Sequence, residues 1–247
     1  MNLRPHPRVI ALDVGGVLYY DEPFELAWLQ DVLDHSGADV GEFNQRVRAF
    51  YLQPGTGTPV LYPPLGTSGW HRVRAAWSDL AQPVPGALNA VNILARRYEL
   101  CVIANQPPEC LQTLKDLGLA QHMRAIALDS LVGISKPDPG LFQWALERLG
   151  RRPEDLLMVG DRPAHDAVPA RALGCQAVIV RPDDGWRPPD GVNPALLAAY
   201  RGIRRERARR AAAANSDWLT ITDLAELART LPGHDPDNRT ATGGAPA

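Results

Sequence analysis

Short apolar segments alternate along this chain with segments of helical spacing, and this alternation restricts the fold more than any other feature of the sequence. Each apolar segment is only four or five residues long, which is the length of a buried strand. Strands that alternate with helices over short connections form a parallel sheet with helices on both faces. The predicted strands are Val9–Leu12, Leu100–Ala104, Ala125–Leu128, Leu156–Val159 and Ala177–Val180, with Trp218–Ile221 as an edge strand.

Two long segments interrupt this alternation and divide the chain into a core and inserted parts. Residues 21–84, between the first two predicted strands, contain three stretches of helical spacing and predict a helical cap domain. Residues 183–216 begin as a loop rich in Pro, Gly and Asp and continue as an Ala- and Arg-rich helix, which we assign to the core as an insert. The predicted core therefore comprises residues 1–20 and 85–232, and the polar tail 233–247 is predicted to be disordered.

Composition is that of a soluble globular protein and excludes several classes of partner. The chain has 247 residues, of which 45% are hydrophobic and 22% charged, and its net charge of −2 favours neither nucleic acid nor a membrane surface. No apolar run approaches the roughly 20 residues of a membrane span, and Met1–Arg8 lacks the apolar stretch of a signal peptide. Three cysteines show no metal-ligand spacing. We expect a cytoplasmic protein with a small-molecule partner, and the oligomeric state stays open.

Polar side chains stand where the predicted strands end. Asp13 follows the first strand, and Asp161 and Asp166 follow the fourth. Because the carboxyl ends of parallel strands share one edge, where open α/β sheets bind ligands, these carboxylates are expected in one crevice. They would repel one another unless a cation joins them, and hard oxygen ligands suit Mg²⁺. Lys136 adds a fixed positive charge and Asn105 an amide donor, so the set suits phosphoryl transfer.

Taken in order, these motifs resemble those of the haloacid dehalogenase-like (HAD) hydrolase superfamily. The resemblance covers roughly residues 8–182, and more weakly 217–231. It implies a doubly wound parallel α/β sheet, the Rossmannoid core of that superfamily, with a small helical cap that selects the substrate. The segments that carry it are Asp13-Val14-Gly15-Gly16-Val17, Ala104-Asn105, Ser135-Lys136-Pro137-Asp138 and Gly160-Asp161 with Asp166.

The resemblance also implies a role for each motif residue. Asp13 would be the nucleophile that forms an aspartyl-phosphate, with Lys136 as the second catalytic residue. The bound cofactor would be Mg²⁺ and the substrate a small phosphorylated molecule. The implied ligands are Asp13, Gly15 through its backbone carbonyl, Asp161 and Asp166 for Mg²⁺, and Gly16, Asn105 and Lys136 for the phosphoryl group.

Two positions depart from the pattern of the superfamily. Gly15 stands where most of its phosphatases have a second aspartate, the general acid that protonates the leaving oxygen. General acid catalysis is typically worth about 10²–10⁴-fold in rate. Ala104 stands where Ser or Thr is usual, which removes one hydroxyl donor to the phosphoryl oxygens, a loss on the order of 1–3 kcal/mol where nothing replaces it.

Three functions remain compatible with these motifs. The preferred one is a Mg²⁺-dependent phosphatase. The first alternative is a metal-independent, dehalogenase-like hydrolase, because halide leaves without a proton, although both carboxylates implied as metal ligands are retained. The second is a catalytically impaired binding or regulatory protein that kept the fold. His35 and His71 are candidate replacements for the missing acid, although a lone histidine is more often structural or exposed. Arg162 and His165 are interpreted as surface residues, with a substrate contact as the alternative.

Overall fold

The structure is a computed structural model that describes residues 6–52, 68–181, 184–214 and 218–231. It divides into two compact units, which we describe separately. The predicted tail 233–247 lies outside the described residues. The first unit comprises Met1–Tyr19, Pro83–Asp183 and Leu219–Ala247, and the second comprises Tyr20–Gln82 and Asp184–Trp218.

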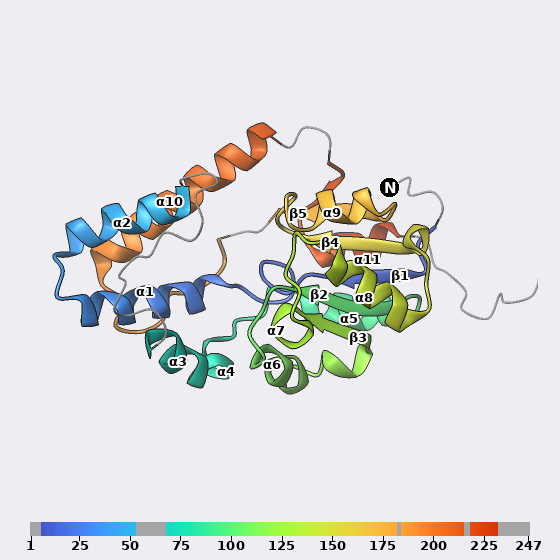
Figure 1. The fold of residues 1–247 in the computed structure, drawn as a ribbon, viewed down its shortest axis with the longest axis horizontal. Helices are drawn as coiled ribbons and strands as arrows, with labels where there is room; N and C mark the ends of the chain where they lie inside the picture. The colour runs from blue at the N-terminus through green and yellow to red at the C-terminus, as the bar shows by residue number, and fades with distance from the viewer. Residues whose placement is uncertain (1–5, 53–67, 182–183, 215–217, 232–247) are drawn as a thin grey trace, which may run out of the picture. The chain divides into compact units, whose positions relative to one another are not determined.

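A six-stranded sheet forms the centre of the first unit (Figure 1), and every strand is parallel to its neighbours. The strand order is β3-β2-β1-β4-β5-β6, so the chain builds outward from β1 in both directions. This arrangement confirms the predicted doubly wound parallel α/β sheet. The strands are β1 Val9–Leu12, β2 Glu99–Ala104, β3 Met123–Leu128, β4 Leu156–Gly160, β5 Gln176–Val180 and β6 Thr220–Ile221.

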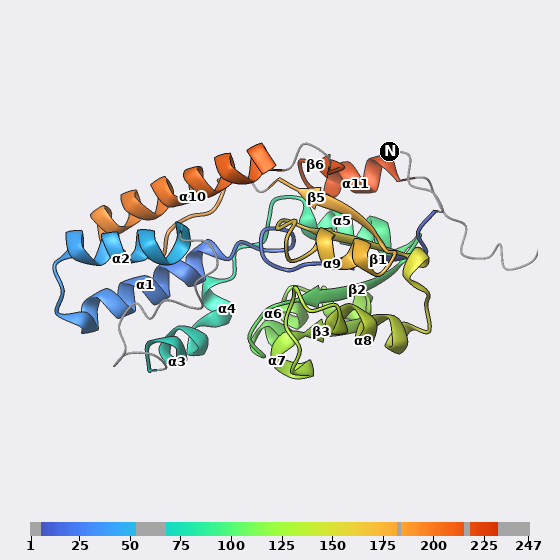
Figure 2. The ribbon, with the colours of Figure 1, turned by 45° about the horizontal axis from the view of Figure 1, so that its top comes forward.

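Helices flank this sheet (Figure 2) and explain why its central strands are apolar throughout. All residues of β1 and β4 are buried, as are the last five residues of β2, because both faces of these strands are covered. Helices α5 and α11 also pack against each other. The helices of this unit are α5 Ala87–Ala95, α6 Cys110–Asp116, α7 Asp129–Val132, α8 Gly140–Leu149, α9 Ala167–Ala172 and α11 Leu224–Thr230.

Among its described residues, the second unit is helical and has an aromatic core of its own. Phe24 and Trp77 stack with ring centroids 3.9 Å apart, and Trp70 meets the rings of both Trp28 and Trp77 edge-on. These aromatic side chains therefore hold the unit together. None of the described helices is long and apolar enough to cross a membrane. The helices are α1 Glu22–Ser36, α2 Val40–Leu52, α3 Ser68–Ala75, α4 Trp77–Leu80 and α10 Pro194–Ala214.

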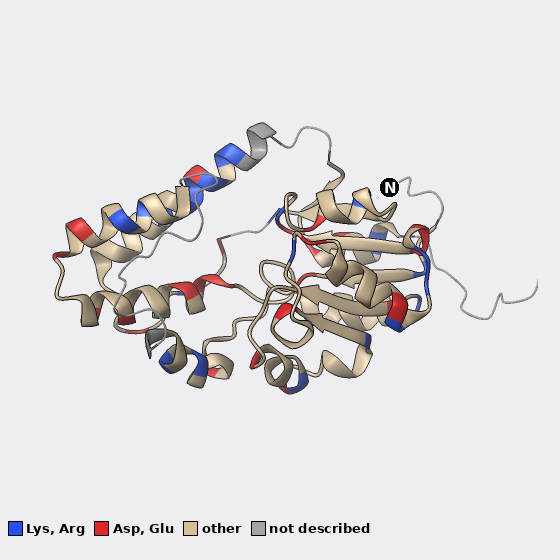
Figure 3. Cartoon of the chain, in the orientation of Figure 1, with Lys and Arg blue, Asp and Glu red and all other residues tan. Residues whose placement is uncertain are grey.

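Helix α10, along which arginines recur (Figure 3), belongs to this second unit. The predicted place of the insert 183–216 in the core is wrong, because Asp184–Trp218 belongs to the second unit. Tyr200 and Ile203 are buried, and the helix packs against α1 and α2. The Tyr200 hydroxyl donates a hydrogen bond to Glu25, and Arg204 forms an ion pair with Glu22. Contacts to α1 and α2, rather than position in the sequence, therefore decide to which unit α10 belongs.

A truncation in β2 tests the buried position of the central strands. Leu100 is 1% exposed, whereas Leu131 on α7 is 52% exposed. We expect Leu100→Ala to lower the free energy of unfolding by about 2–5 kcal/mol, since it removes buried apolar contacts and leaves a cavity. Leu131→Ala should stay within about 0.5 kcal/mol of the parent. Urea unfolding followed by circular dichroism measures both, and equal losses would contradict this placement of β2.

Candidate active site

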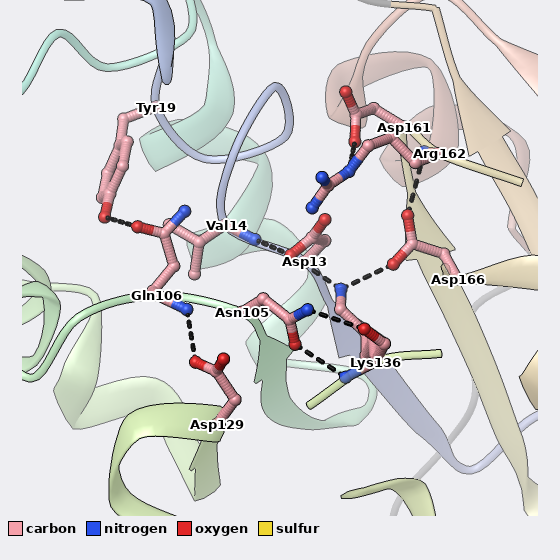
Figure 4. Close-up of polar contacts among 10 residues, drawn as sticks. All are labelled: Asp13, Val14, Tyr19, Asn105, Gln106, Asp129, Lys136, Asp161, Arg162 and Asp166. Carbon is pink, nitrogen blue, oxygen red and sulfur yellow. Dashed lines mark hydrogen bonds and ion pairs between the residues drawn. The ribbon is translucent and has the colours of Figure 1, made fainter. Parts of the chain in front are cut away.

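The carboxyl ends of three neighbouring strands bring the predicted site residues to one edge of the sheet (Figure 4). Asp13 follows β1, Asn105 follows β2 and Asp161 follows β4. Strand β1 pairs with β2 on one side and with β4 on the other. The connection after β1 leads to β2 on one side, and the connection after β4 leads to β5 on the other, so the crevice between β1 and β4 is where open α/β sheets bind ligands. Residues far apart in sequence therefore meet because of strand order.

Three carboxylates converge in this crevice. Asp13, Asp161 and Asp166 each present an oxygen within 4.8 Å of the others. Asp13 and Asp166 are buried, and Asp161 is partly exposed. Asp13 Oδ2 is buried and has no hydrogen-bond partner among the residues that the structure describes. An orphaned buried oxygen beside two more carboxylates fits a hard divalent cation such as Mg²⁺, which takes oxygen ligands.

Lys136 links two of these carboxylates from a fully buried position. Its Nζ lies 2.9 Å from Asp13 Oδ1 and 2.6 Å from Asp166 Oδ1. Burial alone would lower the pKa of Lys136, but the negative charges of Asp13 and Asp166 outweigh it and raise that pKa, so the ammonium stays protonated. Burial and the charge of Asp13 raise the pKa of Asp166 despite the nearby ammonium. One buried ammonium among three carboxylates leaves negative charge in excess.

Asn105, predicted to bind the phosphoryl group, holds the backbone of Lys136. Its Nδ2 donates a hydrogen bond of 2.8 Å to the Lys136 carbonyl, and the Lys136 N–H donates one of 2.8 Å to Asn105 Oδ1. This reciprocal pair fixes the segment that carries the ammonium. The structure therefore gives Asn105 a positioning role, with one of its two amide hydrogens engaged in it.

Two glycines make room for the carboxylates. Gly16 has φ +69°, and a Cβ there would lie 2.9 Å from Asp161 Oδ2. A Cβ on Gly160 would lie 2.2 Å from Cγ of Asp166. Gly16, predicted as a phosphoryl ligand, therefore packs directly against the Asp161 side chain. Gly15 is buried in a bridge to Tyr19, and it carries no acidic side chain.

Asp129 supports the candidate site and was not among the residues predicted from the sequence. Its Oδ1 accepts hydrogen bonds of 2.8 Å from the N–H groups of Gln106 and Ser130, and its Oδ2 accepts one of 2.9 Å from the Ser135 hydroxyl. It therefore ties the loop after β2 to the segment that leads to Lys136. Asp129 directly follows the apolar run of β3, so the strand-end signal that singled out Asp13 was present for it as well.

The remaining candidates fall into two groups. Arg162 lies in the crevice, with its Nε 3.7 Å from Asp161 Oδ1, while its backbone N–H donates a hydrogen bond of 2.9 Å to Asp166 Oδ2. His35 and His71 lie in the second unit. A ring nitrogen of His35 is hydrogen-bonded to the Asp31 carbonyl one turn earlier in the same helix.

Comparison with known proteins identifies the family. The family model for haloacid dehalogenase-like hydrolases matches residues 7–174 of the 247. The chain therefore belongs to the haloacid dehalogenase-like hydrolase family. This confirms both the predicted resemblance and the predicted class of enzyme, a hydrolase.

Individual relatives agree with this assignment. Phosphoserine phosphatase of Thermus thermophilus is 34% identical over 161 residues, which cover 64% of this chain and 61% of that protein. Glyceraldehyde 3-phosphate phosphatase of Methanothermobacter thermautotrophicus is 27% identical over 174 residues, covering 69% of this chain and 73% of that protein. The match to the first of these relatives thus spans less than two thirds of its length.

Solved structures share the fold at low identity. A HAD phosphatase of Thermococcus onnurineus matches with a TM-score of 0.62 and 20% identity, covering 92% of this chain and 99% of that chain. The HAD-hydrolase YfnB of Bacillus subtilis also matches with a TM-score of 0.62, at 18% identity and the same coverage. Both support the fold described above.

Replacing Lys136 tests the charge balance of the site, and the chain's other lysine, exposed Lys115, provides the control. Lys136→Met leaves two buried carboxylates without their cation, so we expect a loss of about 3–5 kcal/mol in unfolding free energy near pH 7. Lys115→Met should change it by less than about 0.5 kcal/mol.

The loss of unfolding free energy caused by Lys136→Met should become smaller toward pH 5. In the folded variant, Asp166 lacks the ammonium that opposes the rise of its pKa on burial, so it takes up a proton at a higher pH than in the unfolded chain, and acid stabilises the variant relative to the parent. Urea unfolding at pH 5 and pH 8 measures the difference. A loss of equal size at the two pH values, or none at all, would contradict the charge balance described here.

Proposed function

We propose that this protein is a cytoplasmic, Mg²⁺-dependent phosphatase that hydrolyses a small phosphorylated metabolite through an aspartyl-phosphate on Asp13. The carrying observation is the Asp13 carboxylate at the carboxyl edge of the sheet. Lys136 and the Val14 N–H hold its Oδ1, and its Oδ2 is unpartnered among the described residues. Membership of a hydrolase family and relatives named as phosphatases support the same reaction. The three cysteines are free and buried, which supports a reducing compartment.

The residues of the site account for each part of this reaction. Asp13 forms a bond to phosphorus while the bond from phosphorus to the leaving oxygen breaks. Lys136 offsets the charge of the carboxylates, and Asn105 keeps its backbone in place. Asp13, Asp161 and Asp166, with the carbonyl of Gly15, would hold Mg²⁺, which supplies positive charge beside the transferring phosphoryl group. Water then attacks the phosphorus, restores Asp13 and releases inorganic phosphate.

The absence of an acid at Gly15 limits which substrates react quickly. The leaving oxygen departs with its electron pair and takes its proton from water. A leaving group that is stable as an anion needs this proton least. Aryl phosphates are therefore expected to react faster than alkyl phosphates, and substrates with acidic leaving groups fit the site best.

Activity toward p-nitrophenyl phosphate tests the proposal. We expect hydrolysis in Mg²⁺ that falls to background in EDTA. Asp13→Asn should lower kcat by at least about 10³-fold, because the nucleophilic carboxylate is lost. Asp116→Asn, which alters an exposed aspartate on α6, is the matched control and should leave kcat unchanged. Steady-state kinetics of the three proteins provide the comparison.

Two results would replace the proposal with an alternative. Release of halide from a 2-haloacid in EDTA, without phosphate ester hydrolysis, would favour a dehalogenase-like enzyme. Inactivity toward a panel of phosphorylated metabolites, with an intact fold and tight phosphate binding, would favour a binding or regulatory protein.

A pair of glycine substitutions tests the place of Asp161 in the cation site. Gly16 and Gly150 have φ values of +69° and +61°, so alanine is strained at both, but only at Gly16 does the added Cβ meet Asp161. We expect Gly16→Ala to raise the half-saturating Mg²⁺ concentration about tenfold or more. Gly150→Ala should lower stability and leave Mg²⁺ dependence unchanged. An equal Mg²⁺ dependence in both variants would contradict a metal role for Asp161.

A further inference from the structure

Three features of the site leave it with few hydrogen-bond donors and little free positive charge to bind a phosphoryl group. Gly15 and the fully buried Ala104 carry no polar side chain. The ammonium of Lys136 lies within 3 Å of two carboxylates, so its charge is largely offset by them. A phosphoryl group brings about two further negative charges to a crevice that already holds three carboxylates. Even with a divalent cation held by the carboxylates, negative charge stays in excess once a phosphoryl group is present, so a further cation would be favourable.

Arg162 places a second cation in this crevice. It directly follows Asp161, and its backbone is fixed by the hydrogen bond from its N–H to Asp166 Oδ2. Figure 4 shows its side chain extending from the loop after β4 toward the Asp13 carboxylate. Its Nε lies 3.7 Å from Asp161 Oδ1, and the side chain is 37% exposed. The guanidinium thus stands at the solvent side of the carboxylates, whereas Lys136 stands beneath them.

We propose that Arg162 is a catalytic residue that binds the non-bridging oxygens of the phosphoryl group during its transfer to Asp13. This proposal rests on the proposed function. The guanidinium presents several N–H donors in one plane, a geometry that matches two oxygens of a phosphoryl group. It supplies donors to a site in which Ala104 offers no hydroxyl. Because Arg162 meets oxygens that stay on phosphorus, it moves no proton, and the leaving oxygen still takes its proton from water.

A surface ion pair that only stabilises the fold explains the position of Arg162 less well than the proposed phosphoryl contact does. Ion pairs of partly exposed side chains contribute only about 0–1 kcal/mol. Placing a guanidinium beside a carboxylate that is to bind a divalent cation also opposes that binding by charge repulsion. This repulsion is offset if the guanidinium contacts the phosphoryl dianion of a bound substrate.

Binding of inorganic phosphate to the full-length protein, measured by calorimetry in Mg²⁺, tests the proposal without turnover. Arg162→Gln should weaken phosphate binding about 10–100-fold, as expected for the loss of charge-assisted hydrogen bonds. Arg162→Lys should be intermediate, because it keeps the charge and loses the planar pair of donors. The matched control is Arg124→Gln, an exposed arginine near the amino end of β3, which should bind phosphate like the parent.

Two further readouts separate a catalytic role from a structural one. The affinity for Mg²⁺ without phosphate should not fall in any variant, because the guanidinium beside Asp161 opposes cation binding. If the loss of phosphate binding instead follows a loss of Mg²⁺ affinity, Arg162 merely positions Asp161 and the proposal is wrong. In Arg162→Gln, kcat/KM should fall by a similar factor for aryl and alkyl phosphates, because the leaving oxygen is not contacted. Phosphate affinity unchanged in Arg162→Gln would also overturn the proposal.

Failure of the proposed function would look different. A parent protein that binds phosphate through Arg162 but hydrolyses no phosphate ester would refute the phosphatase and support the phosphate contact. A parent protein that hydrolyses phosphate esters, with an Arg162→Gln variant of equal phosphate affinity and rate, would refute the contact alone.

Discussion

The site depends on one buried ammonium held between two buried carboxylates. Lys136 contacts Asp13 and Asp166, and these residues come from the end of β1, from the segment before α8 and from the loop after β4. Buried charges are strongly unfavourable unless they are paired, so the three segments must come together for any of the three side chains to be buried. Asn105 and Asp129 fasten the segment that carries the lysine, and the glycines leave space for the acids. The polar site and the apolar sheet therefore form as one structure.

The same arrangement also explains why the site is suited to a cation and then to a phosphoryl group. One ammonium cannot offset three carboxylates, and Asp13 Oδ2 is left without a partner among the described residues. A divalent cation would restore the balance, and an anionic substrate would add negative charge again. On this account Arg162 matters only when substrate is present, which is consistent with its position on the exposed side of the carboxylates.

Much of the core could be predicted because it rests on local signals. Strands buried on both faces are continuous apolar runs, and polar residues at their ends mark the active edge of the sheet, which is how Asp13 and Asp161 were found. The direction in which a side chain points, and the packing of elements far apart in the sequence, could not be predicted. Nothing local shows that the Asn105 amide turns toward the backbone of Lys136. Helix α10 was assigned to the core because it lies between β5 and β6 in sequence, whereas its partners Glu22 and Glu25 precede it by well over one hundred residues.

The central claim is that Asp13 attacks phosphorus, and trapping the covalent intermediate tests it most directly. Protein mixed with an aryl phosphate in Mg²⁺ is quenched with borohydride, which reduces an aspartyl-phosphate to homoserine, and the reduced position is then located by peptide mass spectrometry. The account predicts homoserine at position 13, and none when EDTA replaces Mg²⁺. Turnover of the substrate without reduction at position 13, or with reduction at another aspartate, would contradict it.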